Sequence, residues 1–207
     1  MFTGIVTAIG TIARVEQRGD LRVRIAAPLD PARIDIGASI ACSGVCLTVV
    51  DRGGSVDDAW FDVDVSGETV SRTVSGLWEV NRSLNIEPSL RVGDEIGGHI
   101  VTGHVDSIGE VVLAEQAGDS WRVAIRARAE MAPFLAEKGS VTVDGVSLTV
   151  NDVRDRPDGT CDFALNIIPH TGQVTTLGEL RVGDEVNLEI DVLARYLKRM
   201  QSLSAVS

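Results

Sequence analysis

The chain has 207 residues and a formal net charge of −11, with 44% hydrophobic and 4% aromatic residues. Because no cluster of Lys or Arg interrupts this acidic composition, a nucleic acid or an anionic membrane is not expected as a partner. No apolar run reaches the roughly 20 residues of a membrane span, and the start Met1-Phe2-Thr3 lacks the features of a secretory signal. The three cysteines make a disulfide framework improbable, so reduced thiols in a cytoplasmic protein are expected.

Short strand-like runs separated by turn signals dominate the chain. In chain order, strands are predicted at residues 21–25, 39–42, 46–50, 60–65, 121–125, 140–143, 147–151 and 161–167. Hairpin turns are predicted at residues 52–54 and 156–159, which are rich in Gly, Pro and Asp. Short helices are predicted at residues 30–35 and 129–137, where Pro31 and Pro133 oppose a long helix.

The C-terminal segment that starts at Asp191 carries the strongest helical signal. Its apolar residues at helical spacing are Val192, Leu193, Tyr196, Leu197, Met200 and Leu203. Such an amphipathic helix either packs on its own domain or pairs with other subunits, and the sequence slightly favours oligomerisation.

The chain contains one pattern twice. The matching segments are Thr3-Gly4-Ile5-Val6 with Thr102-Gly103-His104-Val105, residues 44–49 with residues 145–150, and Asn85-Ile86-Glu87 with Asn187-Leu188-Glu189. Three matches in one order, at nearly one offset, indicate two copies of one domain. Because each copy holds several short strands, a small antiparallel barrel is predicted in each half, with two similar binding sites.

One further repeat does not fit this register. Residues 90–95 and residues 180–185 have the same sequence, Leu-Arg-Val-Gly-Asp-Glu, but the register of the other matches places Gly183-Asp184 opposite Asn81-Arg82. This hexapeptide is therefore interpreted as a turn that leads into a strand at two non-equivalent places, without functional weight.

Most reactive side chains lie where the two copies disagree. In register, Ile5 faces His104, Cys46 faces Ser147, Ser43 faces Asp144, Glu68 faces His170 and Ser89 faces Asp191. The agreeing pairs are Thr3/Thr102, Gly4/Gly103, Ser39/Ser140, Thr48/Thr149, Thr69/Thr171 and Asn85/Asn187. We interpret the agreeing set as a common ligand frame, and the disagreeing set as the groups that transfer protons or attack carbon.

Several of these residues have a second interpretation. His99 and His104 lie in a Gly-rich junction and are either proton carriers or ordinary hydrogen-bonded side chains. Cys46 is either a buried structural residue or a site residue, and Asp191 is either a helix N-cap or a catalytic group. A metal centre built from Cys42, Cys46, His99 and His104 remains a minor alternative, since the cysteine spacing is not that of common zinc sites.

The same residues carry a resemblance to a known family. The segments are Met1-Phe2-Thr3-Gly4-Ile5-Val6, residues 43–49, Gly97-Gly98-His99, Gly103-His104-Val105-Asp106, residues 144–150, residues 175–178 and residues 186–191. In this order, over essentially the whole chain, they resemble the alpha-subunit type of riboflavin synthase.

The resemblance implies an all-β fold of two homologous six-stranded antiparallel Greek-key barrels in tandem plus a C-terminal α-helix. It implies an N-terminal lumazine-binding barrel at 1–97, a C-terminal one at 98–190 and an oligomerisation helix at 191–207. The implied reaction is the dismutation of two 6,7-dimethyl-8-ribityllumazine molecules into riboflavin and 5-amino-6-ribitylamino-uracil, with no cofactor and no metal. The implied assembly is a homotrimer, with lumazine synthase as a candidate partner. The alternative is a non-catalytic lumazine- or flavin-binding protein of the same fold.

The resemblance also implies the residues of each site. The N-barrel frame would be Gly4, Ile5, Val6, Cys46, Leu47, Thr48, Asp64, Val65, Ser66, Gly67, Glu68 and Thr69. The C-barrel frame would be Gly103, His104, Val105, Lys138, Ser147, Leu148, Thr149, Ile168, Pro169, His170, Thr171, Gly172 and Gln173. The reactive set would be Ser39, Cys46, His99, His104, Ser147, Thr149 and Asp191, with Phe2 packed near the site.

The chain departs from the family pattern in three places. Residues 75–78 and Asn81-Arg82 replace the usual turns of the first copy, and residues 85–89 read Asn-Ile-Glu-Pro-Ser. Both changes put strand boundaries of the first barrel in doubt. His170 stands where an acidic residue is common, which would change the charge of the second site.

Overall fold

The computed structural model describes residues 1–56 and 58–204. The strands of the first copy are β1 (Ala8–Arg18), β2 (Asp20–Ala26), β3 (Ser39–Cys42), β4 (Val45–Gly53), β5 (Trp60–Val65) and β6 (Ser83–Pro88). They form a closed antiparallel barrel in the order β1-β2-β5-β4-β3-β6, with β6 paired back onto β1. The 3₁₀ turn η1 (Pro31–Arg33) and the helix α1 (Gly67–Arg72) connect these strands.

The second copy repeats this strand order with one interruption. Its strands are β7 (Ser107–Ala117), β8 (Ser120–Ala127), β9 (Ser140–Val143), β10 (Val146–Thr149), β11 (Asp152–Asp155), β12 (Cys161–Ile167) and β13 (Glu185–Ile190). They form a curled sheet in the order β10-β9-β13-β7-β8-β12-β11. Its end strands, β10 and β11, are consecutive in the chain and together take the place of β4.

The fold prediction is confirmed in class and in the tandem arrangement, while the second copy is a curled seven-stranded sheet rather than a six-stranded barrel. The strand predicted at 147–151 ends at Thr149. Two residues later, the Asn151 N–H donates a hydrogen bond to Ala164 of β12. The limits at residues 97/98 and 190/191 stay a prediction.

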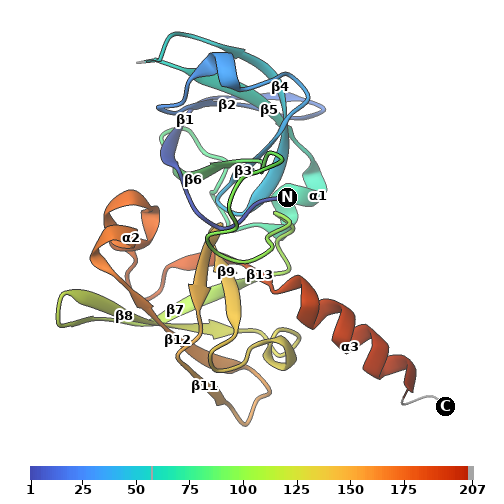
Figure 1. The fold of residues 1–207 in the computed structure, drawn as a ribbon, viewed down its shortest axis with the longest axis vertical. Helices are drawn as coiled ribbons and strands as arrows, with labels where there is room; N and C mark the ends of the chain where they lie inside the picture. The colour runs from blue at the N-terminus through green and yellow to red at the C-terminus, as the bar shows by residue number, and fades with distance from the viewer. Residues whose placement is uncertain (57, 205–207) are drawn as a thin grey trace.

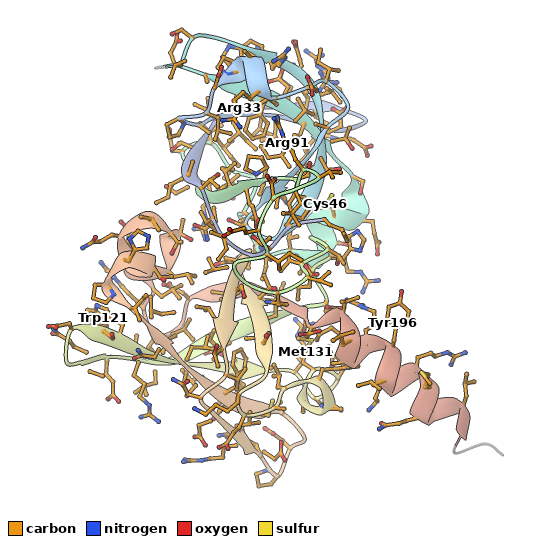
Figure 2. The ribbon with its side chains drawn as sticks, viewed as in Figure 1. Arg33, Cys46, Arg91, Trp121, Met131 and Tyr196 are labelled. Atoms are coloured by element: carbon orange, nitrogen blue, oxygen red, sulfur yellow. The ribbon has the colours of Figure 1, made fainter. Side chains whose placement is uncertain are left out.

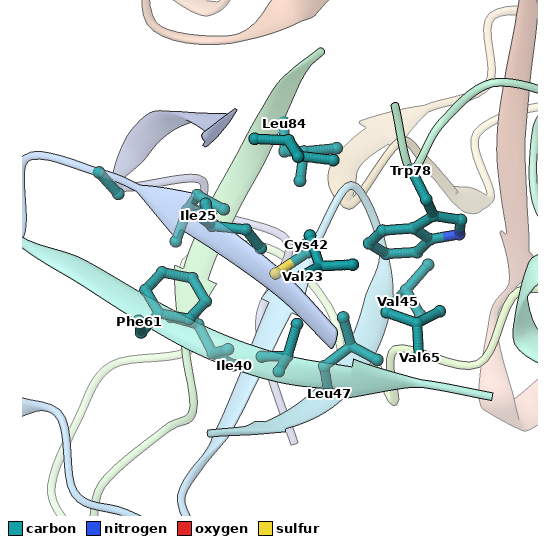
Figure 3. Packing of buried hydrophobic residues seen from close by; sticks show 14 of the residues in the cluster. Val23, Ile25, Ile40, Cys42, Val45, Leu47, Phe61, Val65, Trp78 and Leu84 are labelled. Atoms are coloured by element: carbon teal, nitrogen blue, oxygen red, sulfur yellow. The ribbon is translucent and has the colours of Figure 1, made fainter. Parts of the chain in front are cut away.

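Alternating side chains of the strands fill the first barrel. Ile25, Phe61 and Leu84 are completely buried and pack with Cys42 and Trp78 (Figure 3). Full burial of one large apolar side chain contributes about 1.5–3 kcal/mol. A second core of the same kind lies inside the second sheet.

The two copies meet through their equivalent hairpin turns. Ser43-Gly44 and Asp144-Gly145 have positive φ at both positions, as a tight two-residue hairpin requires. A Cβ on Gly44 would lie 2.9 Å from the Gly145 nitrogen, so only glycine permits this approach. The amide Nδ2 of Asn85 donates to the Asp144 carbonyl at 2.9 Å, and Nδ2 of Asn187 donates to the Ser43 carbonyl at 3.0 Å. These reciprocal contacts relate the copies by an approximate twofold axis.

The divergent segment of the first copy keeps this symmetry. Asn81 has φ of 70°, and its N–H donates to the Ile12 carbonyl at 2.8 Å. Gly183 has φ of 94° and makes the equivalent bond to Val111 at 2.9 Å. Asn tolerates the left-handed conformation, so the strand boundaries that were in doubt are preserved. The hexapeptide repeat is non-equivalent, as predicted, although only its second occurrence leads into a strand, β13.

The predicted short helices are only 3₁₀ turns, η1 and η2 (Ala132–Phe134), and each has a proline in its first turn, where proline is tolerated. Two more short helical elements follow β12, namely α2 (Pro169–Val174) and η3 (Thr176–Glu179).

The C-terminal helix α3 (Val192–Ser204) is confirmed and extends away from both sheets (Figure 1). Asp191 caps it by accepting a hydrogen bond from the Leu193 N–H at 2.9 Å. Arg195 anchors it through Asp106 at 2.7 Å. No helix among residues 1–56 and 58–204 is long and apolar enough to cross a membrane.

Candidate functional site

Two buried carboxylates hold the two copies of the Thr-Gly segment. Glu87 accepts hydrogen bonds from the backbone N–H and the hydroxyl of Thr3, at 2.7 and 2.8 Å, and from the Gly4 N–H at 2.9 Å. Glu189 does the same for Thr102, at 2.7 and 2.6 Å, and for Gly103 at 2.8 Å. Hydrogen bonds to a charged group are the stronger kind, so each segment is held rigidly. Sequence reasoning missed both roles, although the repeated Asn-x-Glu triplet contained the signal.

Each Thr-Gly segment crosses to the other copy. The Gly4 carbonyl accepts from the Ser147 N–H at 2.8 Å, and the Gly103 carbonyl accepts from the Cys46 N–H at 2.8 Å. Val6 packs on the core of the second copy, and Val105 packs on the core of the first.

This crossing bears on the grouping of the two frames. Gly4 and Val6 contact the second copy, and Gly103 and Val105 contact the first, whereas the resemblance grouped each segment with its own copy; the ligand frames stay a prediction. The reason is the approximate twofold packing of the copies, which is a long-range property. Nothing in the local sequence shows it.

The first cluster combines the segment 103–105 with the ends of β4 and β5. Because Val49 pairs with Val63, residues 46–48 neighbour Asp64 and Val65. The Asp64 carboxylate receives two bonds from Arg22, at 2.6 and 3.0 Å. Ser66 caps α1 by accepting from the Thr69 N–H at 3.1 Å. The remaining frame residues of this cluster, Gly67 and Glu68, lie in the first turn of α1.

The second cluster combines the segment 4–6 with β10 and α2. Ser140 of β9 pairs with Thr149, as Ser39 of β3 pairs with Thr48 in the first copy. Five residues predicted for this site, 169–173, lie within α2, and Ile168 precedes its first turn. His170 is exposed, in the first turn of this helix.

His99 contacts the second cluster directly. Its Nδ1 lies 2.7 Å from the Ser147 hydroxyl, and its Nε2 lies 3.2 Å from the Thr142 hydroxyl. Burial lowers the pKa of His99, while the negative charges of Asp191 and Glu189 act in the opposite direction. The structure therefore brings His99 and Ser147 together, while Asp191 caps α3 and acts on His99 only through its charge.

His104 lies at the other cluster. Its backbone N–H donates to Glu189 at 3.0 Å and its side chain is exposed, next to the Gly103 carbonyl that bonds Cys46. The two histidines thus serve different clusters, which the sequence did not show.

Cys46 of β4 lies at the end of the first barrel that is nearer the second copy (Figure 2). It packs with Phe2, Ala41 and Val101 in a small apolar cluster. Cys42 instead points into the barrel core, and burial raises the pKa of its thiol well above the usual range. The two thiols point in different directions, because Cys42 and Cys46 belong to two strands joined by a hairpin turn. Within the described residues, no group of three His, Cys, Asp or Glu side chains could hold a metal ion.

Lys138 has a strained backbone conformation, which the comparison of the two copies in sequence did not predict. Its φ is 62°, and its N–H donates to Val150 at 2.8 Å. The first copy has Gly37 at this position, with φ of 87° and the equivalent bond to Val49. A non-glycine residue in this conformation costs on the order of 1–3 kcal/mol, and such strain concentrates at functional sites. The exposed Lys138 side chain is therefore a further difference between the two clusters.

Comparison with known sequences identifies both copies. The lumazine binding domain family matches residues 3–89 and 102–191. Riboflavin synthase of Brucella abortus is 47% identical over 97% of this chain and 98% of its own length. Riboflavin synthase of Photobacterium phosphoreum is 43% identical over 97% of this chain and 88% of its own length.

Solved structures agree with the fold. LumP in complex with riboflavin superposes with a TM-score of 0.75 at 24% identity, over 92% of this chain and 99% of the other. LumP in complex with 6,7-dimethyl-8-(1'-D-ribityl) lumazine gives a TM-score of 0.74 at 22% identity, with the same coverage. At this level of identity the likeness concerns the fold alone.

Proposed function

Because the chain belongs to the riboflavin synthase family, we propose that its two clusters bind two molecules of 6,7-dimethyl-8-ribityllumazine and transfer a four-carbon unit between them. The products are riboflavin and 5-amino-6-ribitylamino-uracil. One observation carries the proposal: two nearly equivalent frames, each held by a buried glutamate, carry unequal reactive side chains. A dismutation needs this inequality, since two identical substrates take donor and acceptor roles.

The residues divide the chemistry between the clusters. The 7-methyl group of the lumazine is acidic because its carbanion delocalises into the ring. At the second cluster, the neutral ring of His99 can accept or relay a proton, and Ser147 supplies a hydroxyl beside it. At the first cluster, the exposed ring of His104 and the thiol of Cys46 supply a base and a group that stabilises adducts. Holding two planar substrates face to face converts a bimolecular encounter into a positioned one.

We propose that the protein works as a homotrimer whose α3 helices pair. Leu193, Tyr196 and Leu197 on α3 are 67%, 65% and 59% exposed (Figure 2 labels Tyr196). A stripe of this kind is typical of a helix that packs against a partner. In the trimer, the first cluster of one subunit would face the second cluster of another. Lumazine synthase stays a candidate partner.

Incubation of the purified protein with 6,7-dimethyl-8-ribityllumazine alone tests the activity. We expect riboflavin fluorescence, with one riboflavin formed for every two lumazines consumed. Lumazine that binds but is not converted would instead support the non-catalytic binding protein. Loss of activity with a chelator would revive the metal alternative.

Two variants test the assignment of roles. We expect His104→Ala to lose turnover far more than lumazine binding, and wild-type turnover would remove His104 from the mechanism. We expect deletion of residues 193–207 to give monomers of low activity in sedimentation experiments. An unchanged mass would disprove the role of α3.

A further inference from the structure

Three neighbouring strands of the second sheet present one row of polar side chains. Thr142 of β9 pairs with Ser147 of β10 on one side and with Glu189 of β13 on the other. Directly paired residues of neighbouring strands point to the same face of a sheet. The equivalent row of the first copy is Cys46, Ala41 and Glu87, so an alanine replaces the central threonine.

His99 covers this row. Besides its contacts to Ser147 and Thr142, its backbone N–H donates to the Thr3 carbonyl at 3.2 Å. Gly98 permits the close approach, because a Cβ there would lie 2.1 Å from the Thr3 carbonyl oxygen. Thr142 is only 1% exposed, so its hydroxyl has no access to bulk water.

We propose that Thr142 is a positioning residue: its hydroxyl oxygen accepts a hydrogen bond from His99 Nε2–H, which holds the ring in one tautomer and leaves Nδ1 to accept from the Ser147 hydroxyl. Both contacts are within hydrogen-bond distance and are compatible with this direction, 2.7 Å between the Ser147 hydroxyl and Nδ1 and 3.2 Å between Nε2 and the Thr142 hydroxyl.

Thr142 supplies the hydroxyl that is within hydrogen-bond distance of Nε2. Both carboxylate oxygens of Glu189 already accept hydrogen bonds from the segment 102–104. A neutral imidazole has one donor and one acceptor nitrogen, so fixing the proton on Nε2 fixes the role of Nδ1. The catalytic meaning rests on the proposed function: with Ser147 donating to Nδ1, its oxygen carries more negative charge toward the substrate.

The tautomer of the His99 ring can be measured without an assay of enzymatic activity. The protein has three histidines, so ¹⁵N spectra of histidine-labelled protein resolve the ring of His99, with His104→Gln and His170→Gln as assignment variants. We expect a single Nε2–H tautomer in the wild type. In Thr142→Val we expect both nitrogens to move toward averaged positions, and in Thr142→Ser we expect the wild-type pattern. Thr142→Ala serves if the valine variant does not fold, since the first copy has Ala41 at this position.

Turnover of 6,7-dimethyl-8-ribityllumazine is the second measurement. We expect kcat of Thr142→Val to fall about tenfold, the effect of one hydrogen bond, with KM nearly unchanged and Thr142→Ser close to the wild type. An Nδ1–H tautomer in the wild type, or unchanged ring signals in both Thr142→Val and Thr142→Ala, would overturn the proposal. If the ring responds as expected while the wild type forms no riboflavin, the positioning role stands and the proposed function fails.

Discussion

Replacing Glu189 by glutamine tests the role of the buried carboxylates. The Glu189 carboxylate is 2% exposed and accepts four hydrogen bonds, two from Thr102 and one each from Gly103 and His104. A glutamine has nearly the same shape but only one acceptor oxygen. Its NH₂ group must therefore face at least one backbone N–H.

The hydrogen-bond geometry sets the expected magnitude. If the amide oxygen faces Thr102, the NH₂ group meets the N–H groups of Gly103 and His104. If the amide is turned, its NH₂ group can donate to the Thr102 hydroxyl, and only the Thr102 N–H loses its partner. Each buried donor without a partner costs about 1–3 kcal/mol, so we expect Glu189→Gln to lower the free energy of unfolding by about 2–4 kcal/mol. That is a large fraction of the total stability of a typical domain.

Urea denaturation followed by circular dichroism measures this loss, and lumazine titration measures the effect on binding. We expect weaker binding as well, because the segment 102–104 borders the first cluster. Glu87→Gln is the matched variant for the second cluster, and the exposed Glu137→Gln is the control for charge removal. A Glu189→Gln protein within about 0.5 kcal/mol of the wild type would refute the proposed role of the carboxylate.

Two other perturbations test the contacts between the copies. Burial raises the pKa of Asp144 to about 7, against the weaker opposite effects of the Asn187 N–H hydrogen bond and of Arg82, so the carboxyl binds a proton more tightly in the folded protein than in the unfolded chain. The wild type should therefore lose stability as pH rises from about 4 to about 7, and Asp144→Asn should remove up to about 4 kcal/mol of this loss. Denaturation at pH 5 and pH 8 measures the change in the free energy of unfolding, with a variant of the exposed Asp119, Asp119→Asn, as control. Equal pH dependence of the wild type and Asp144→Asn would contradict the reasoning. Gly4→Ala should destabilise by more than about 2 kcal/mol in the same assay, because φ is +75° and the new Cβ would lie 2.5 Å from Ser147 Cβ. Gly118→Ala is the control, because Gly118 has φ of +65° but no atom lies within 4 Å of its added Cβ, so this variant has the backbone strain without the steric clash. Equal destabilisation by both variants would count against the contact between the copies.

The sequence by itself determined the duplication, the fold class and most strands. The turn predicted at 156–159 joins β11 to β12, and the tail helix follows from its apolar spacing and the cap at Asp191. These features depend on neighbours along the chain, where spacing and turn chemistry are visible in the residues themselves. The family resemblance further named most residues of the candidate site.

Only the tertiary structure decided which residues meet across the copies. It placed Gly4 against Ser147 and Gly103 against Cys46, although the resemblance grouped each segment with its own copy. It also showed Thr142 beneath His99, 43 positions away in the chain. The approximate twofold packing of the copies sets the crossed contacts, and the folding of the 98–101 junction over β9 sets the contact of His99. Neither kind of contact leaves a local pattern in the sequence.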